Sequence, residues 1–299
     1  MSLLEGRVAI ITGAGRGVGR AYALMMAAHG AKVLVNDLGS SPEGQGADQT
    51  PAEEVVSEIR AAGGEAAVNT ADVSDWKAVQ QMIEQAVDTF GGLDILVNTA
   101  GVLRDRMLVN MSEDEWDLMV RVHLKGTFAP IHHAGNFWRL QQKKGQMPDA
   151  RIINTTSHSG LFANIGQANY ASAKGGIATL TQIAARELAR YGVTCNAIAP
   201  RANTRLTEGM REWTPEQVEK RRPEWVAALV TWLASPESKD VSGRIFEAWG
   251  YRFSVIESWQ HGPAAVPSKD PTELGARIHE IVRYARANAG IDPNSWSNP

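Results

Sequence analysis

The chain has one cysteine, Cys195, so no disulfide can form within it. Cys195 lies in the apolar run 193–198, where we expect a buried structural thiol rather than a nucleophile. Basic residues are not in excess, because 30 Lys and Arg face 33 Asp and Glu, for a formal net charge of −3. This balance gives no electrostatic basis for binding nucleic acid or an anionic membrane. We therefore expect small-molecule ligands.

Long hydrophobic runs are also missing. The longest largely apolar stretch, 226–234, is too short to span a bilayer. The first residues lead into the run Val8–Ile11 without a signal-peptide core, and the last three residues are not the peroxisomal Ser-Lys-Leu. We expect a cytoplasmic protein with no membrane partner. His132 and His133 are adjacent and would diverge on a helix, so we predict no metal site.

Strand-like and helix-like segments alternate along the chain. The expected strands are listed here: Val8–Ile11, Lys32–Asn36, Glu65–Thr70, Leu93–Val97 and Arg151–Thr156. Thr50–Glu53 and Ser112–Glu115 have the sequence of a capping box, which marks the start of a helix. This alternation predicts an α/β fold, a doubly wound parallel sheet flanked by helices on both faces, of the Rossmann type. Ligands bind such sheets at the carboxyl ends of their strands.

No Pro/Gly/Ser-rich linker divides the chain near its middle, so we expect a single domain with a C-terminal helical tail. Residues 1–250 would form the catalytic domain, with a substrate lid at about 201–222. Residues 251–299 would form an extension without further strands. Thr272–Ala289 has helical spacing of apolar residues, and we expect it to pack on its own domain or on a second subunit.

A glycine-rich loop follows the first strand and precedes an apolar helix. Its candidate cofactor residues are Gly13, Gly15, Arg16, Gly17, Val18 and Gly19. Glycines allow the backbone to approach a pyrophosphate, and the helix N-terminus supplies free N–H groups and a positive dipole end. The loop could also be a tight turn without a ligand, since its spacing differs from the strict Gly-x-Gly-x-x-Gly pattern.

An acidic residue, Asp37, ends the second strand, 18 residues after Gly19. A carboxylate at this place can accept hydrogen bonds from the adenosine ribose and would repel a 2′-phosphate. This position favours NAD over NADP. Arg16 points weakly the other way, because a guanidinium in the glycine loop could meet a 2′-phosphate.

Two further segments end at the same predicted edge. Asp72 and Val73 follow the third strand and could border the adenine, although Asp72 could instead cap the next helix. Asn98 ends the fourth strand, and the small residues Ala100 and Gly101 that follow would let the backbone lie flat against a cofactor.

The candidate catalytic residues come from the second half of the chain. Tyr170 and Lys174 are four residues apart, so on a helix they share one face, and a nearby ammonium would lower the pKa of the phenol. Ser157 lies at the end of the fifth expected strand. Tyr170 and Lys174 could also be an exposed pair on a helix surface without a catalytic role. His123 faces inward among apolar residues, as a buried core histidine does.

Taken together, Thr12-Gly13…Gly17-x-Gly19, Asn98-x-Ala100-Gly101, Ser157 and Tyr170-x-x-x-Lys174 resemble the short-chain dehydrogenase/reductase family over about residues 6–249. The resemblance implies that Tyr170 is the general base, that Ser157 binds the substrate oxygen and that Lys174 holds the nicotinamide ribose. It also places Pro200 and Thr204 near the nicotinamide. His123 stands where most members have an asparagine that holds a relay water, and Thr99 and Arg201 are further departures.

Within the family, several segments resemble the dehydrogenase domain of peroxisomal multifunctional enzymes of type 2. This implies NAD-dependent oxidation of a (3R)-hydroxyacyl-CoA or a 17β-hydroxysteroid by a homo-oligomer. Two other classes stay open: an NADPH-dependent 3-oxoacyl-thioester reductase and a catalytically idle NAD-binding module. Basic lid residues could meet CoA phosphates or form a solvated face: Arg205, Arg211, Lys220, Arg221 and Arg222.

Overall fold

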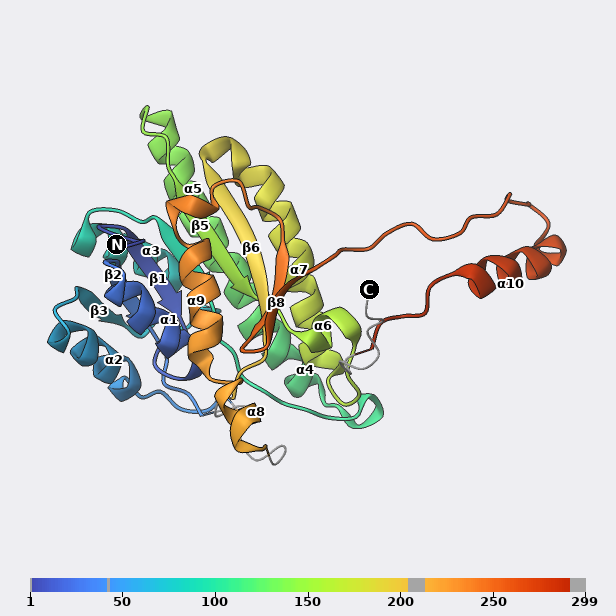
Figure 1. Ribbon diagram of the computed structural model, residues 1–299, viewed down its shortest axis with the longest axis horizontal. Helices are drawn as coiled ribbons and strands as arrows, with labels where there is room; N and C mark the ends of the chain where they lie inside the picture. Colours follow the sequence, from blue (N-terminus) through green and yellow to red (C-terminus); the bar gives the residue numbers. More distant parts are fainter. Residues whose placement is uncertain (1, 42–43, 204–212, 291–299) are drawn as a thin grey trace. The chain divides into compact units, whose positions relative to one another are not determined.

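The computed structural model describes residues 2–41, 44–203 and 213–290. These residues form a sheet of eight strands in the order β3-β2-β1-β4-β5-β6-β7-β8 (Figure 1). The strands are β1 (Val8–Thr12), β2 (Lys32–Asn36), β3 (Ala66–Asn69), β4 (Ile95–Asn98), β5 (Ala150–Thr155), β6 (Val193–Pro200), β7 (Ile245–Trp249) and β8 (Arg252–Ile256). Neighbouring strands are parallel except for the antiparallel pair β7–β8. The predicted doubly wound α/β sheet is confirmed.

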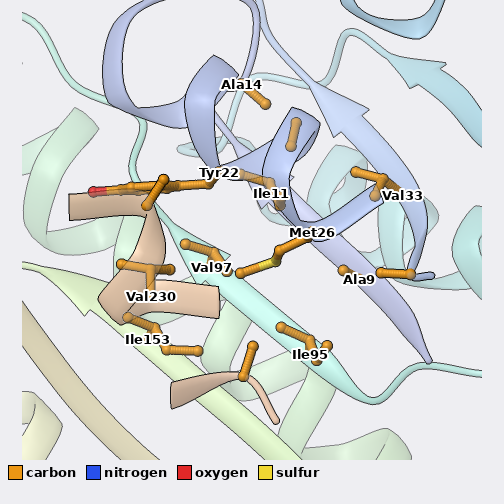
Figure 2. Close-up of a cluster of buried hydrophobic side chains, with 14 of the residues drawn as sticks. Ala9, Ile11, Ala14, Tyr22, Met26, Val33, Ile95, Val97, Ile153 and Val230 are labelled. Atoms are coloured by element: carbon orange, nitrogen blue, oxygen red, sulfur yellow. The ribbon is translucent and has the colours of Figure 1, made fainter. Parts of the chain in front are cut away.

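Helices cover both faces of this sheet. One face carries α1 (Gly17–Ala28), α2 (Thr50–Ala61) and α9 (Pro223–Leu233), and the other carries α3 (Trp76–Phe90), α5 (Gly126–Lys143) and α7 (Ala168–Leu188). Because strand side chains alternate, Ala9 and Ile11 face the first group, whereas Val8 and Ile10 face the second. Figure 2 shows Tyr22 and Met26 of α1 against Ile11, Val97 and Val230 in the first of these cores.

The order of the strands creates the ligand crevice. The chain runs outward from β1 through β2 to β3, and then returns to β4 on the other side of β1. The loops after β1 and β4 therefore leave the sheet in opposite directions at its carboxyl edge. Dinucleotides bind at this kind of reversal in open α/β sheets. The remaining short helices lie in connections: α4 (Glu113–Met119), α6 (His158–Phe162) and α8 (Pro215–Glu219).

Two local predictions about helix starts had different outcomes. The capping box at Ser112 is confirmed, because its hydroxyl accepts from the Glu115 N–H and the Glu115 side chain accepts from the Ser112 N–H. The capping box at Thr50 is wrong. Helix α2 already includes Thr50, and Gln49 precedes it without a side-chain cap. Asp48 instead accepts a hydrogen bond from the Thr50 N–H.

The C-terminal part of the sheet differs from the prediction. We expected no strand after Trp249, but β8 pairs antiparallel with β7, and Arg252 lies opposite Trp249. An exposed edge strand of five residues lacks the continuous apolar run that marks buried strands, which explains why the pattern hid it. The predicted domain boundary at 250 falls inside this hairpin.

The chain divides into two compact units, Met1–Ile256 and Glu257–Pro299. The second unit contains a short turn of helix, η5 (Pro271–Glu273), and the helix α10 (Leu274–Tyr284). The predicted helix Thr272–Ala289 therefore starts within η5 and ends earlier than expected, at Tyr284. Asp270 accepts a hydrogen bond from the Thr272 N–H and starts the helical turn. None of the described helices is both long and apolar enough to cross a membrane.

Candidate active site

A cavity of about 280 Å³ opens at the carboxyl edge of the sheet. Most of the predicted site residues line it: Gly13, Arg16, Gly17, Val18, Gly19, Asp37, Asp72, Val73, Ala100, Gly101, His123, Ser157, Tyr170, Lys174 and Pro200. Gly15 and Asn98 lie beside the cavity without lining it, and Thr204 falls outside the described residues. The fold thus brings residues from both halves of the sequence into one crevice.

The glycine loop between β1 and α1 leaves backbone groups open to a ligand. Gly13 has φ +64°, and a Cβ there would lie 2.7 Å from Ala100 Cα. A Cβ on Gly19 would lie 2.1 Å from the Gly13 carbonyl oxygen. Arg16 precedes α1 and does not cap it with its side chain. The first N–H groups of α1 therefore have no side-chain acceptor. This arrangement fits the pyrophosphate of a dinucleotide.

Asp37 is fixed by two backbone donors. Its Oδ2 accepts from the Gly15 N–H at 2.8 Å and its Oδ1 from the Gly39 N–H at 2.7 Å. Each carboxylate oxygen keeps a second lone pair, so the group can still accept from ribose hydroxyls. Arg16 reaches the Ser40 carbonyl oxygen at 3.4 Å, which places its guanidinium close to the same end of the cavity.

Asp72 and Asn98, the next predicted site residues along this edge, have different roles. Asp72 accepts from both the N–H and the hydroxyl of Ser74, at 2.8 Å each, while Asp75 caps α3. The predicted alternative of Asp72 as a helix cap is therefore wrong. Asn98 is buried and donates to Asn154 Oδ1 at 2.9 Å, which ties β4 to β5.

Ser157, Tyr170 and Lys174 converge from α6 and α7. Ser157 caps α6, its hydroxyl accepting from the Ser159 N–H. Lys174 is buried and its Nζ donates to the Thr155 carbonyl oxygen at 2.7 Å. The ammonium lies 5.7 Å from the centre of the Tyr170 ring. The spacing of four residues therefore does place both groups on the cavity side of one helix.

The pKa values in this group differ from the expectation. Burial raises the pKa of Tyr170, and the hydrogen bond with Ser157 offsets only part of this rise. Burial also lowers the pKa of Lys174 to about 7. A lysine near half protonation at neutral pH stabilises a phenolate less than a full ammonium would. The expected lowering of the Tyr170 pKa by Lys174 is therefore wrong here.

His123 lies on a π-helical segment, η2 (Val120–Lys125), between α4 and α5. Its Nε2 lies 2.8 Å from the Val102 carbonyl oxygen and 3.3 Å from the Val102 N, and the shorter contact, which needs a donor on the ring, assigns the proton to Nε2. Nδ1 is then an acceptor, buried without a protein partner. Burial lowers the pKa of His123 to about 3. A Cβ on Gly101 would lie 2.5 Å from His123 Cε1, so glycine is needed to make room for the ring. Irregular turns of this kind are frequent at functional sites.

Sequence reasoning missed part of the cavity wall. Leu38, Ser40, Ser41 and Gly44 line it, and they belong to the polar loop that leads from β2 to α2. The length of this loop was the available signal, because long structureless connections in compact domains are often functional. Thr155 and Arg121 also line the cavity.

The predicted lid is described only in part. Arg205 and Arg211 lie outside the described residues. Arg222 pairs with Glu224 at 3.2 Å and with Glu219 at 3.6 Å. Lys220 and Arg221 lie over aromatic rings, Lys220 over Trp225 and Arg221 over Trp213. Across residues 2–41, 44–203 and 213–290, no group of three or more His, Cys, Asp or Glu side chains is placed to hold a metal ion.

Comparison with known proteins agrees with this geometry. A family model described as short chain dehydrogenase matches residues 7–217. The chain is 41% identical to hydroxyacyl-CoA dehydrogenase ChsB1 of Mycobacterium tuberculosis, over 97% of this chain and 91% of that protein. It is 44% identical to the peroxisomal multifunctional enzyme type 2 of Mus musculus, over 81% of this chain and 31% of that longer protein.

A solved structure shows the same fold. The crystal structure of a short chain dehydrogenase from Mycobacterium avium matches with a TM-score of 0.88 and 46% identity, over 97% of this chain and 99% of that one. The family resemblance that the motifs predicted is confirmed. The chain belongs to the short chain dehydrogenase family.

Proposed function

We propose that this protein oxidises a (3R)-3-hydroxyacyl-CoA to the 3-oxoacyl-CoA, with NAD as the hydride acceptor. The observation that carries the proposal is the convergence of Ser157, Tyr170 and Lys174 in one cavity with the glycine loop and Asp37. The substrate class is inferred from the relatives named hydroxyacyl-CoA dehydrogenase and peroxisomal multifunctional enzyme.

The cofactor assignment rests on Asp37 and the glycine loop. The loop backbone and the start of α1 would hold the pyrophosphate, and Asp37 would accept from the adenosine ribose. Bound NAD supplies a carbon that accepts a hydride from the substrate. Lys174 lines the same cavity beside the end of β5, where its Nζ donates to the Thr155 carbonyl oxygen, and it would bind the nicotinamide ribose close to Tyr170.

In the oxidation, the substrate loses a hydride from its hydroxyl-bearing carbon and a proton from its hydroxyl group. Tyr170, as phenolate, takes the proton. The Ser157 hydroxyl donates a hydrogen bond to the substrate oxygen and fixes its distance from Tyr170. His123 holds no charge at neutral pH, because burial keeps its pKa at about 3. It therefore brings no positive charge to the site, and its ring packs edge-on against the ring of Tyr170.

Initial rates of NAD and NADP reduction test the proposal, measured with (3R)- and (3S)-3-hydroxyacyl-CoA and with a 17β-hydroxysteroid. We expect turnover with NAD and the (3R)-thioester, reduced at least about a hundredfold in Tyr170→Phe. Turnover of the steroid alone would reject the acyl-CoA substrate. Equal rates in Tyr170→Phe and the unmodified protein would reject Tyr170 as the base.

A variant at position 37 tests the cofactor assignment separately. Asp37→Ser removes the carboxylate that would repel a 2′-phosphate, and we expect the preference for NAD over NADP to fall by about tenfold or more. Arg16→Ala is the matched comparison on the same loop. Two rates are compared: the rate with NADP in Arg16→Ala and the rate with NAD in Asp37→Ser. A larger fall in the first than in the second would favour an NADP-dependent enzyme.

The second candidate is an NADPH-dependent 3-oxoacyl-thioester reductase. Arg16 lines the cavity and reaches Ser40 at the same end as Asp37, which is where a 2′-phosphate would lie. Faster reduction of a 3-oxoacyl-CoA with NADPH than oxidation with NAD would support it. An idle cofactor-binding module would bind NADH but turn over none of these substrates. A cytoplasmic location and a homo-oligomer stay predictions.

A further inference from the structure

A carboxylate far from the motifs lies completely buried next to the cavity wall. Glu247, in β7, has no exposed surface. Its Oε1 accepts hydrogen bonds from Arg201 Nε at 2.6 Å and from His158 Nε2 at 2.8 Å. Its Oε2 receives the Ser254 hydroxyl at 3.1 Å and lies 3.4 Å from Arg252 Nε. One side chain therefore joins β7, β8, α6 and the segment after β6.

The proton positions follow from the chemistry of the group. Burial by itself would raise the pKa of Glu247. The hydrogen bonds and charges of His158 and Arg201 lower it by more than burial raises it, so the pKa lies below the usual range. An ionised carboxylate only accepts hydrogen bonds, so His158 Nε2 must be the donor. The 3.2 Å approach of Arg201 Nε to His158 Nε2 is then a close contact and not a second hydrogen bond.

Two of these partners directly follow residues of the active site. His158 comes after Ser157, and Arg201 comes after Pro200, which lines the cavity. His158 and Arg201 are held by the same oxygen atom of Glu247. One oxygen atom therefore links the residue that follows the catalytic serine with the residue that follows Pro200.

We propose that Glu247 is a positioning residue that sets the place of Ser157 through His158, and of Pro200 through Arg201. The inference rests on the proposed function only for its kinetic test. Charge-assisted hydrogen bonds in a dry site are short and directional, so they suit this task. Arg201, which replaces the glycine usual in the family, is then one of the two side chains through which Glu247 acts.

The chain supplies a matched comparison at the other end of the sheet. Arg151 is also buried, and its guanidinium pairs with Asp149 at 2.6 Å, at the amino end of β5. Asp149→Asn also removes a carboxylate from a buried cation, although Asp149 itself is half exposed and Glu247 is not, and Asp149 contacts no residue that lines the cavity. His158→Asn is a milder second variant, because it removes one partner and leaves Glu247 paired with Arg201.

The kinetic test is a double-mutant cycle with Ser157→Ala. We expect Glu247→Gln to lower kcat by about tenfold in the unmodified protein and by only about threefold in Ser157→Ala, where the contact through Arg201 to the Pro200 segment is the one that still matters. Asp149→Asn should leave kcat unchanged within about twofold while lowering the melting temperature. A loss of kcat that is equal in both backgrounds would show a general structural role and overturn the proposal.

Hydrogen exchange of the backbone amides gives a readout that needs no substrate. We expect exchange in residues 156–162 to be about tenfold faster in Glu247→Gln and in His158→Asn, and unchanged in Asp149→Asn. Unchanged protection of this segment in both variants would overturn the proposal, whatever the substrate is. If the unmodified protein oxidises no hydroxyacyl-CoA, the proposed function fails, and the exchange data still decide the role of Glu247.

Discussion

The ring of His123 stands edge-on to the ring of Tyr170, with 5.1 Å between the ring centres and 85° between the planes. This contact joins the π-helical segment to α7, which carries the candidate base. The imidazole donates from Nε2 to the Val102 carbonyl oxygen, so its orientation is fixed from the opposite side. Position 123 thus supports the phenol through packing.

His123→Asn should preserve the shape of the pH profile of kcat/KM, because a histidine with a pKa of about 3 does not titrate in the working range. We expect kcat to fall by about two- to fivefold from the lost ring contact. Loss of an ionisation near pH 6.5 in the variant would contradict this. The folded pKa is depressed, so the wild-type free energy of unfolding should fall as the pH drops from 6.5 toward 3, more than in His123→Asn.

Lys174→Met should stabilise the fold and abolish catalysis. The pKa of Lys174 falls to about 7 in the folded chain from an ordinary value of 10.5. The unfolded chain thus binds the extra proton between these values, and wild-type stability rises with pH across that window. We expect a gain of roughly 1–4 kcal/mol at pH 7 that shrinks as the pH approaches 10.5.

Chemical denaturation at several pH values measures this gain. Lys125→Met is the comparison, because Lys125 is exposed on the neighbouring segment and should change stability by less than about 0.5 kcal/mol. A gain that is the same at pH 7 and pH 10 would show that burial of the charge is not its cause.

The rate of alcohol oxidation should rise with pH across the whole range from 6 to 9. Burial raises the pKa of Tyr170, so the phenolate fraction keeps growing with pH in this interval, and kcat/KM should increase by up to about tenfold per pH unit. Reduction of the ketone needs the phenol and should not share this rise. A plateau in the oxidation rate below pH 8 would mean that the bound complex lowers the Tyr170 pKa after all.

Ala163→Gly should stabilise the protein. Ala163 ends α6 with φ 59° and ψ 146°, a region that side chains rarely adopt, and it lies on the segment between Ser157 and Tyr170. Relief of this strain should exceed the added entropy of the unfolded chain by about 1 kcal/mol. Ala228→Gly, at an exposed position inside α9, should destabilise by about the same amount. Thermal unfolding that ranks the two variants in the opposite order would refute the assignment of strain.

Local patterns were enough for much of the fold. Alternating apolar runs predicted the parallel strands, because a strand buried on both faces reads as continuous hydrophobic sequence. The glycine loop, Asp37 and the Tyr170–Lys174 spacing could be read as a nucleotide site and a catalytic pair, since each depends on residues close in sequence. The edge strand β8 and the wrong capping box at Thr50 show where the local signal was weak.

The sequence by itself determined the family, the order of most of the elements and most of the predicted residues that line the cavity. Only the tertiary structure decided the protonation of the site. The low pKa values of His123 and Lys174 come from burial by segments far away in the chain. The same holds for Glu247, whose partner His158 lies 89 residues earlier in the sequence. Desolvation and long-range hydrogen bonds depend on which segments meet, and no local spacing records that.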